Sequence, residues 1–377
     1  MDGRPLRILQ VLAGLNLGGA EQLVVSLAGW LRAHGHEVLV ANLTSGRTLV
    51  HAFHREGVTV VQTENRGPIA RFYPIRLVRL IRQFRPDVVH CHNTAWLKTA
   101  MACRWTHVPC VFTLHSYHEM WLREHARYLR HAAAVTDFCV GVAPGIDRLF
   151  QDILGMPTQR TLYIHNGVPD IFLSQPPPVD WKAPVPRDAW VVGMVARFDG
   201  HQKDQPTLVR AVQMARQRVP NLHLVLIGDG PHRPAVEDLV RGIGAEEYVH
   251  FVGLREDVAV LLHHLHLFVL SSTLEGESLA ILEAMSAQRP IIATAVGGTP
   301  GLLANGECGI LVPPGDVPAM AEAMVDLLTN SEKARELARR ARQRFLQGYT
   351  IDRMAERYLE VYRQAIDGRS SRNDASD

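Results

Sequence analysis

The segment from Ser271 to Met285 combines a glycine turn with two carboxylates eight residues apart, Glu275 and Glu283. The apolar run at residues 267–270, directly before this segment, favours a buried strand that ends here, and a helix is expected to begin near Glu277. A helix N-terminus presents free backbone N–H groups and a partial positive charge, which suits a diphosphate. A neighbouring carboxylate can accept two hydrogen bonds from a vicinal diol. The segment therefore predicts a site for a phosphorylated ligand that carries hydroxyl groups.

An ordinary surface role is the alternative for both acidic helix residues. Glu277 suits the first turn of any helix, and Glu283 alone fits a solvated helix face about as well as a binding site. Glu283 is flanked by Leu282, Ala284 and Met285, among which an unpaired charge would be costly. This pattern favours a binding role for Glu283.

Two cations follow another expected strand. Arg197 comes directly after the apolar run Val191–Ala196, and Lys203 lies six residues further on, in a loop. Open α/β sheets bind ligands at the carboxyl ends of their strands, so these cations are placed to neutralise a diphosphate. Without other context, an Arg and a Lys in a loop are more often simply solvated.

A glycine pair, Gly18 and Gly19, precedes an amphipathic helix expected over residues 21–33. Such a turn lets the backbone approach an anion closely, but it equally fits a turn of a Rossmann-like domain that binds nothing. The chain has no Gly-x-Gly-x-x-Gly fingerprint after a strand, which argues against a dehydrogenase.

Four histidines are expected near the ends of neighbouring strands: His90, His92, His115 and His118. A metal site there is the less favoured alternative, because no acidic partner and no HExxH spacing accompanies them. We therefore expect no metal and no other cofactor, and we expect these histidines in the core or in a pocket.

Short apolar runs alternate with helical patterns along the whole chain, which is typical of a parallel α/β fold. Strands are expected at residues 7–13, 38–43, 58–61, 87–91, 111–114, 138–142, 161–164, 191–196, 222–227, 249–252, 267–270, 291–295 and 309–312. Helices are expected at residues 75–84, 318–328, 332–346 and 351–366, among others. Five prolines between residues 176 and 186 predict an extended linker. We therefore expect domains of residues 1–175 and 176–350, followed over 351–377 by a helix and a polar tail that frays from Gly368.

The composition, 47% hydrophobic and 21% charged, excludes a disordered chain, a collagen-like chain and a small disulfide scaffold. Residues 1–175 carry a net charge of +6 and the remainder −4, which suggests an anionic partner for the first part; a nucleic-acid partner is not expected. The odd number of cysteines, five, indicates reduced thiols. No apolar run approaches the ~20 residues that span a membrane, so we expect a cytoplasmic protein.

The Glu275–Glu283 segment resembles the Glu-x7-Glu signature of the GT4-type retaining glycosyltransferases. It departs from the usual family pattern at Glu277 and Ser278, where Phe and Gly or Pro are common. Further matches follow in the family's order, at residues 15–21, 86–92, 108–115, 165–168, 227–231 and 296–300. The chain also departs in the spacing from Arg197 to Lys203, one residue longer than usual, and at Gly301, where Glu is common.

The resemblance implies the GT-B fold: two Rossmann-like domains that face each other across a cleft, with a C-terminal helix that crosses back to the N-terminal domain. The first domain would take the acceptor and the second the nucleotide sugar. The implied reaction moves a sugar from a UDP- or GDP-linked donor to a hydroxyl acceptor with retention, by metal-independent front-face transfer. Synthesis of a glycan, a polysaccharide or a glycolipid is the expected setting.

The resemblance also assigns roles. Arg197 and Lys203 would neutralise the diphosphate, Glu275 and His115 would contact the donor sugar, and Glu283 would bind the ribose. The remaining residues expected to bind the donor are Gly18, Gly19, Gly253, Leu254, Gly276, Glu277, Ser278 and Leu279.

Three alternatives stay open. The arginines from Arg66 to Arg85 surround an amphipathic helix that could contact the inner face of a membrane as a peripheral patch, or could simply be solvated. The enzyme could instead be a sugar-nucleotide 2-epimerase of the same fold. It could also be an inactive module that binds a glycan or a nucleotide sugar.

Overall fold

The computed structural model describes residues 4–16, 18–64, 73–115, 119–200 and 202–374. Its contacts divide the chain into two compact units. The first comprises Met1–Gly167 together with Ile351–Asp377, and the second comprises Val168–Thr350. The two units are described separately below.

Among the described residues, the first unit contains a seven-stranded parallel sheet of order β3-β2-β1-β4-β5-β6-β7. The middle strands form because runs of apolar residues are buried on both faces, as a parallel sheet between helices requires. The strands are β1 (Arg7–Leu12), β2 (Glu37–Asn42), β3 (Thr59–Gln62), β4 (Val88–His92), β5 (Cys110–Leu114), β6 (Phe138–Gly141) and β7 (Thr161–Tyr163).

Two groups of helices pack around this sheet. One group consists of α1 (Gly19–Ala33), α2 (Val50–Arg55) and the C-terminal helix α14 (Ile351–Asp374). The other consists of α3 (Ile75–Phe84), α4 (Trp96–Thr106), α5 (Glu119–Val135) and α6 (Ile146–Leu154). Two 3₁₀ turns complete the unit: η1 (Asn93–Ala95) and η2 (Thr158–Arg160).

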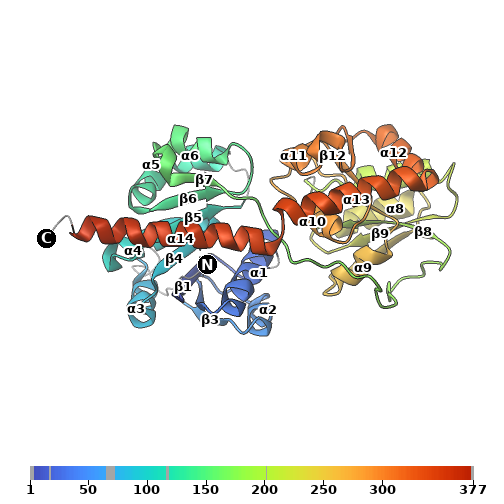
Figure 1. Cartoon of the computed structure of the whole chain (residues 1–377). Helices are drawn as coiled ribbons and strands as arrows, with labels where there is room; N and C mark the ends of the chain where they lie inside the picture. Colours follow the sequence, from blue (N-terminus) through green and yellow to red (C-terminus); the bar gives the residue numbers. More distant parts are fainter. Residues whose placement is uncertain (1–3, 17, 65–72, 116–118, 201, 375–377) are drawn as a thin grey trace. The chain divides into compact units, whose positions relative to one another are not determined.

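Helix α14 belongs to the first unit although it comes last in sequence. Figure 1 shows it running along the first sheet, and it contacts β4, β5 and α1. Four apolar or aromatic side chains of the helix are buried: Met354, Tyr358, Val361 and Tyr362. The expected crossing back of the terminal helix is therefore confirmed.

Within the described part of the second unit lies a six-stranded parallel sheet of order β10-β9-β8-β11-β12-β13. Its strands are β8 (Trp190–Val195), β9 (Leu222–Ile227), β10 (Val249–Gly253), β11 (Leu267–Leu270), β12 (Ile291–Thr294) and β13 (Ile310–Val312). Its helices are α7 (Gln205–Ala215), α8 (Arg233–Gly242), α9 (Val258–His264), α10 (Leu279–Ser286), α11 (Thr299–Leu302), η3 (Ala304–Gly306), α12 (Val317–Thr329) and α13 (Ser331–Gly348).

Both sheets have the strand order of a doubly wound fold, which reverses direction at one point. In the first sheet the reversal lies between β1 and β4, and in the second between β8 and β11. Connections on the two sides of such a point leave toward opposite faces, which opens a crevice at the carboxyl ends of these strands. The fold therefore offers one candidate binding position in each unit.

Three expectations need correction: the domain boundary, the proline-rich linker and the C-terminal tail. The contacts divide at Gly167, not at residue 175, because Ile171 N and Leu173 N already donate hydrogen bonds to side chains of the second unit. The proline-rich segment lacks helix and strand, but it is not a free linker, since Val179 and Trp181 pack against the core of the second unit.

The C-terminal tail also differs from the expected frayed end. Helix α14 continues through Gly368 to Asp374. Arg369 holds this last part, because its guanidinium lies 3.0 Å from the Asp137 carboxylate and donates to Val135 O at 2.9 Å. A local polar composition did not reveal this distant partner.

Candidate active site

The strongest cluster of predicted residues lies at the reversal point of the second sheet. β8 and β11 are paired neighbours, and the loops that follow them carry Lys203 and Glu275. Lys203 Nζ lies 2.5 Å from Glu275 Oε1, and Ser272 Oγ donates to the same oxygen at 2.6 Å. Glu275 is buried, and Lys203 is partly buried. The structure thus brings Lys203 and Glu275 together as an ion pair.

Hydrogen bonds hold the loop from Arg197 to Lys203 in place. Ser271 Oγ lies 2.9 Å from Lys203 O, and Thr273 N donates to Gln202 O at 2.8 Å. Gln205 Nε2 donates to Arg197 O at 2.9 Å. The loop with one residue more than usual is therefore held against the turn after β11.

Arg197 contrasts with its neighbour Lys203. Its side chain is exposed, and its guanidinium makes no hydrogen bond or ion pair with any residue that the structure describes. An unpaired guanidinium at the carboxyl end of β8 is free to bind an anion bidentately.

Two glycines after β12, Gly297 and Gly298, pack directly against the turn that carries Glu275. Gly298 N donates to Gly276 O at 2.9 Å. Gly297 has a left-handed φ of +53°, and a Cβ atom there would lie 1.7 Å from Glu275 O. Any side chain at Gly297 would displace the backbone that carries Glu275. This close approach explains the glycine pair in the 296–300 segment.

Helix α10 begins at Leu279, with Ser278 as its N-cap, two residues later than expected. The Ser278 side chain makes no capping hydrogen bond, so the first backbone N–H groups of α10 are not satisfied by that hydroxyl. Glu277 and Ser278 are buried, and Leu279 is partly exposed. The turn at Gly276 thus leads directly into a helix N-terminus at the sheet's carboxyl edge.

Glu283 lies in the middle of α10 and keeps part of its side chain exposed. Its carboxylate has no hydrogen bond or ion pair within the described residues. Desolvation by the surrounding protein raises the pKa of Glu283 to about 7. A carboxylate that is desolvated by its surroundings and has no partner among the described residues is a strong candidate for binding ligand hydroxyls.

Gly253 ends β10 with a φ of +70°, and Leu254 follows with 57% of its surface exposed. Gly228 N, at the end of β9, donates to Gly253 O at 2.9 Å. This places an exposed apolar side chain at the same carboxyl edge of the sheet, two strands from β8.

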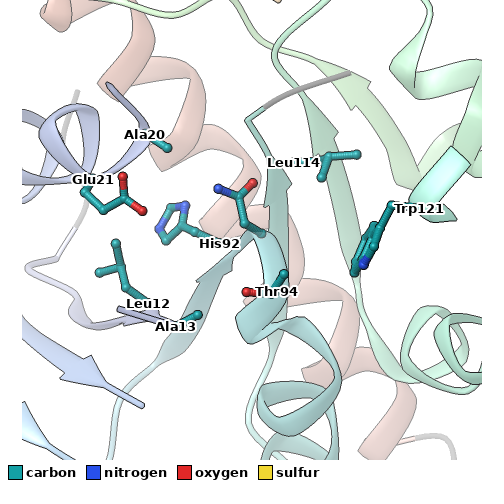
Figure 2. Close-up of a pocket in the computed structure, with 9 residues that line it drawn as sticks. Leu12, Ala13, Ala20, Glu21, His92, Thr94, Leu114 and Trp121 are labelled. Carbon is teal, nitrogen blue, oxygen red and sulfur yellow. The ribbon is translucent and has the colours of Figure 1, made fainter. Parts of the chain in front are cut away.

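The first unit has a pocket of about 300 Å³ at its own reversal point. In Figure 2 the side chains of Glu21 and Trp121 lie on opposite sides of it, with His92 between them. The lining residues are Leu12, Ala13, Ala20, Glu21, His92, Asn93, Thr94, Leu114 and Trp121. Apolar walls with a few polar groups are typical of sites for small organic ligands.

Of the predicted histidines, His92 lines this pocket and bonds to His115. His92 Nδ1 lies 2.9 Å from His115 Nε2, and His115 N donates to Asn93 Oδ1 at 3.0 Å. Desolvation lowers the pKa of His115 to about 4 and places that of His92 well below its usual value. His90 is fully buried and bonds to Tyr362 and Thr113, whereas His118 lies outside the described residues.

Gly18 and Gly19 lie at the start of α1, with Gly18 as N-cap. The Glu21 carboxylate folds back over this turn, since a Cβ atom on Gly18 would lie 2.3 Å from Glu21 Oε2. These residues and His115 belong to the first unit, whereas the Arg197, Lys203, Glu275 and Glu283 group belongs to the second.

No group of three or more His, Cys, Asp or Glu side chains in the described part of the chain could hold a metal ion. None of the helices the structure describes is long and apolar enough to cross a membrane. All five cysteines are buried free thiols.

Comparison with known proteins decides the family. A model described as Glycosyltransferase Family 4 matches residues 17–170, and one described as Glycosyl transferases group 1 matches residues 189–330. The chain belongs to the GT4 glycosyltransferases. The GT-B fold inferred from its signature is confirmed as well.

Similar proteins cover nearly the whole length of this GT4 chain. The putative glycosyltransferase EpsD of Bacillus subtilis (strain 168) is 26% identical over 349 residues, which is 87% of this chain and 90% of EpsD. A glycosyltransferase structure from Rickettsia africae has a TM-score of 0.81 at 19% identity and covers 97% of this chain and 99% of its own. Anabaena Alr3699/HepE in complex with UDP and glucose has a TM-score of 0.79 at 23% identity, covering 94% and 99%.

Sequence reasoning missed two polar residues of this glycosyltransferase. Ser272 bonds to Glu275 and was visible only as one residue of the motif. Gln10 bonds to His92 from within β1, and the only signal was a polar residue that interrupts an apolar run.

Proposed function

We propose that this protein transfers a sugar from a UDP- or GDP-linked donor to a hydroxyl acceptor, with retention at the anomeric carbon. The observation that carries the proposal is the cluster at the carboxyl ends of β8 and β11. There the ion pair of partly buried Lys203 with buried Glu275 lies in loops that also carry the exposed Arg197 and lead to the start of α10. Cations, a helix N-terminus and carboxylates are the groups that a diphosphate and its sugar hydroxyls require.

The chemical problem is the negative charge that grows on the departing diphosphate. Arg197, the remaining N–H donors of Lys203 and the N-terminus of α10 would stabilise this charge electrostatically, without a divalent metal. Because Lys203 is already held by Glu275 and its loop by Ser271, its ammonium needs little reorganisation when the donor binds.

The carboxylates would bind hydroxyl groups of the donor. Glu275 accepts from Ser272 and Lys203 through Oε1, so Oε2 is the oxygen we assign to the donor sugar. Glu283 would accept the two ribose hydroxyls, and Gly253 and Leu254 would lie against the base. Gly276, Glu277, Ser278 and Leu279 would surround the diphosphate through their backbone.

The acceptor is assigned to the pocket of the first unit. Trp121 offers an aromatic face and Glu21 a hydrogen-bond acceptor, which together suit a sugar ring that carries hydroxyls. Gly18, Gly19 and His115 would contact the donor from this unit. Front-face attack, assisted by the leaving phosphate, needs no protein nucleophile and is the route we favour over a covalent one.

Release of UDP or GDP from a panel of nucleotide sugars, with and without glycan acceptors, tests the function. Wild type should release nucleotide with one donor class, and Glu275→Gln should lose most of this activity while keeping its circular dichroism spectrum. Epimerised donor in the absence of acceptor would indicate a 2-epimerase. Saturable binding without turnover would indicate a binding module, and either result contradicts the proposal.

A membrane contact of the first unit is proposed through α3. The apolar face of this helix is used in the core, because Leu77, Val78 and Ile81 are buried, so it does not itself offer a surface for insertion. Arg76, Arg79 and Arg82 are exposed on the other face. Nearby, exposed Tyr73 stacks on exposed Trp105 with ring centroids 6.2 Å apart. Arg66 and Arg71, also part of the predicted patch, lie outside the described residues.

Cosedimentation with phosphatidylglycerol and phosphatidylcholine vesicles tests this contact. Each cation near an anionic surface contributes about 1 kcal/mol, so changing Arg76, Arg79 and Arg82 to Gln should weaken binding to the anionic vesicles about 100-fold. The matched control changes three exposed arginines of the second unit: Arg187, Arg210 and Arg335. Equal binding by both triple variants would exclude α3 as the contact.

A further inference from the structure

A continuous chain of side-chain hydrogen bonds runs through the first unit from His115, which bonds to the pocket-lining His92, to α14. Its links are His115 Nε2 to His92 Nδ1 (2.9 Å), His92 Nε2 to Gln10 Oε1 (2.8 Å), Gln10 Nε2 to Tyr362 Oη (3.2 Å), Tyr362 Oη to His90 Nδ1 (2.7 Å), His90 Nε2 to Thr113 Oγ1 (2.8 Å) and Thr113 Oγ1 to Tyr358 Oη (3.1 Å). The side chains of this hydrogen-bond chain come from strands β1, β4 and β5, from His115 just after β5, and from helix α14.

The amide of Gln10 sets the direction of every bond toward His115. Its oxygen can only accept, so His92 must donate from Nε2. A neutral imidazole carries one N–H, so Nδ1 of His92 accepts, and His115 must donate to it from Nε2. The Nδ1 atom of neutral His115 is then left with a lone pair and no proton.

The hydrogen bonds on the Tyr362 side of Gln10 are consistent with these donor and acceptor assignments. Gln10 Nε2 donates to the Tyr362 hydroxyl, whose own proton then bonds to His90 Nδ1. His90 consequently donates from Nε2 to Thr113. All links are satisfied without a charged member, as a buried polar network requires.

Exposure shows where a ligand can meet this chain. Gln10, His90, His92, Thr113, Tyr358 and Tyr362 are all buried, with at most 3% of their surface accessible. Of the seven described members, His115 alone is partly exposed. Desolvation also keeps His90, His92 and His115 neutral at pH 7, because it lowers the pKa of each.

We infer that Gln10, His92 and Tyr362 are positioning residues that lock His115 as its Nε2–H tautomer, so that Nδ1 accepts a hydrogen bond from a substrate hydroxyl. The inference rests on the proposed function only for the identity of the substrate as a sugar. It assigns a polarity to this contact: a hydroxyl or an amine is accepted, and a carbonyl or carboxylate oxygen at the same place is rejected, because it would face a lone pair.

Nitrogen-15 NMR of the ligand-free protein, labelled on histidine, tests the tautomer. The His115 signals are identified by their loss in His115→Asn. Wild type at pH 7 should show an unprotonated Nδ1 and a protonated Nε2. A protonated Nδ1 would overturn the inference, and this result is obtained whether or not the protein proves to be a transferase.

Variants of Gln10 test the positioning role. Gln10→Leu removes both the accepting oxygen and the donating nitrogen of the amide at similar volume, and His115 should become a mixture of tautomers. Complete burial favours the neutral acid in Gln10→Glu, which keeps an acceptor for His92 Nε2 and a donor for Tyr362 and should retain the single wild-type tautomer. Thr99→Val, equally buried but bonded to the backbone oxygen of Ala95 just before α4, is the matched control and should leave the signals unchanged. A single unchanged tautomer in folded Gln10→Leu would contradict the positioning role.

Activity gives a second measure once a donor is known. Gln10→Leu should lower kcat/KM about 3- to 10-fold, the value of one ordinary hydrogen bond, and Gln10→Glu should restore most of it. Equal losses in both variants would point to a purely structural effect.

Discussion

The two reversal points of this molecule share a topology and differ in chemistry. At the end of β8 and β11, ionised groups dominate: Lys203 pairs with Glu275 beside a free Arg197. At the end of β1 and β4, the pocket is lined mostly by apolar residues, and a chain of hydrogen-bonded neutral groups reaches it through His92, with His92 and His115 held uncharged by desolvation. The strand order thus fixes where a ligand can bind, and the loop residues determine which charge it carries.

Net charge alone does not locate the proposed diphosphate site. The first 175 residues carry +6 and the remainder −4, which suggested an anionic partner for the first part. The cations that we assign to the diphosphate lie in the acidic remainder. A site is defined by the two or three groups that converge on it, and the sum over a domain mainly affects solubility and long-range association.

The largest effect should come from the charged reversal point. Arg197→Ala and Lys203→Ala should each lower kcat about 10²- to 10³-fold, because each removes a preorganised cation from the leaving diphosphate. Arg197→Ala is the cleaner test, since its guanidinium has no partner within the described residues, whereas Lys203→Ala also leaves buried Glu275 unpaired. Arg210→Ala, an exposed arginine on α7, is the control. Losses below tenfold in both variants would make these ordinary surface cations.

Glu283→Gln should weaken UDP or GDP binding roughly 10- to 150-fold. The variant keeps size and one acceptor oxygen, but hydrogen bonds to a charged group contribute about 1.5–3 kcal/mol. Calorimetry on the two proteins measures the difference, and acceptor binding should barely change. Equal nucleotide affinities would remove the ribose role from Glu283.

The same variant should be more stable than wild type, in a way that depends on pH. The pKa of Glu283 rises from 4.5 to about 7 on folding, so the folded state binds more protons between these values and wild-type stability falls as pH increases through this window. The free energy of unfolding of Glu283→Gln should exceed that of wild type only slightly at pH 5 and by at most about 3 kcal/mol at pH 8. Thermal unfolding at both pH values measures it. A gain independent of pH would mean that Glu283 is ionised without penalty.

The smallest effect should follow removal of divalent metals. EDTA should leave the initial rate nearly unchanged, because cations of the protein would neutralise the diphosphate. A loss of most activity that Mn²⁺ or Mg²⁺ restores would contradict this prediction.

Most of the fold could be predicted from sequence because its signals are local. The strand expected at 222–227 coincides with β9, and that at 267–270 with β11, since buried parallel strands are continuous apolar runs. The family motif likewise marked Glu275 and Lys203 as members of one site. Their mutual ion pair depends on loop geometry, which the motif does not specify.

The unpredicted features depend on partners far apart in the chain. Gln10 and Tyr362 are 352 positions apart, and Arg369 meets Asp137 across 232. Each of these residues looks unremarkable in its own segment: a polar interruption in a strand, a tyrosine on an amphipathic helix, an arginine in a polar tail. Only the folded arrangement of β1, β6 and α14 gives them a role.

Helix α14 has a consequence for how the protein is made. The second unit is one continuous stretch whose ends meet, since Val168 and Thr350 form a parallel bridge and Val168 N donates to Tyr349 O at 3.1 Å. The first unit is interrupted by it and needs residue 362 to complete its buried polar chain. A ribosome therefore delivers every residue of the second unit before the first can close. The unit that begins synthesis earliest is the last to finish folding.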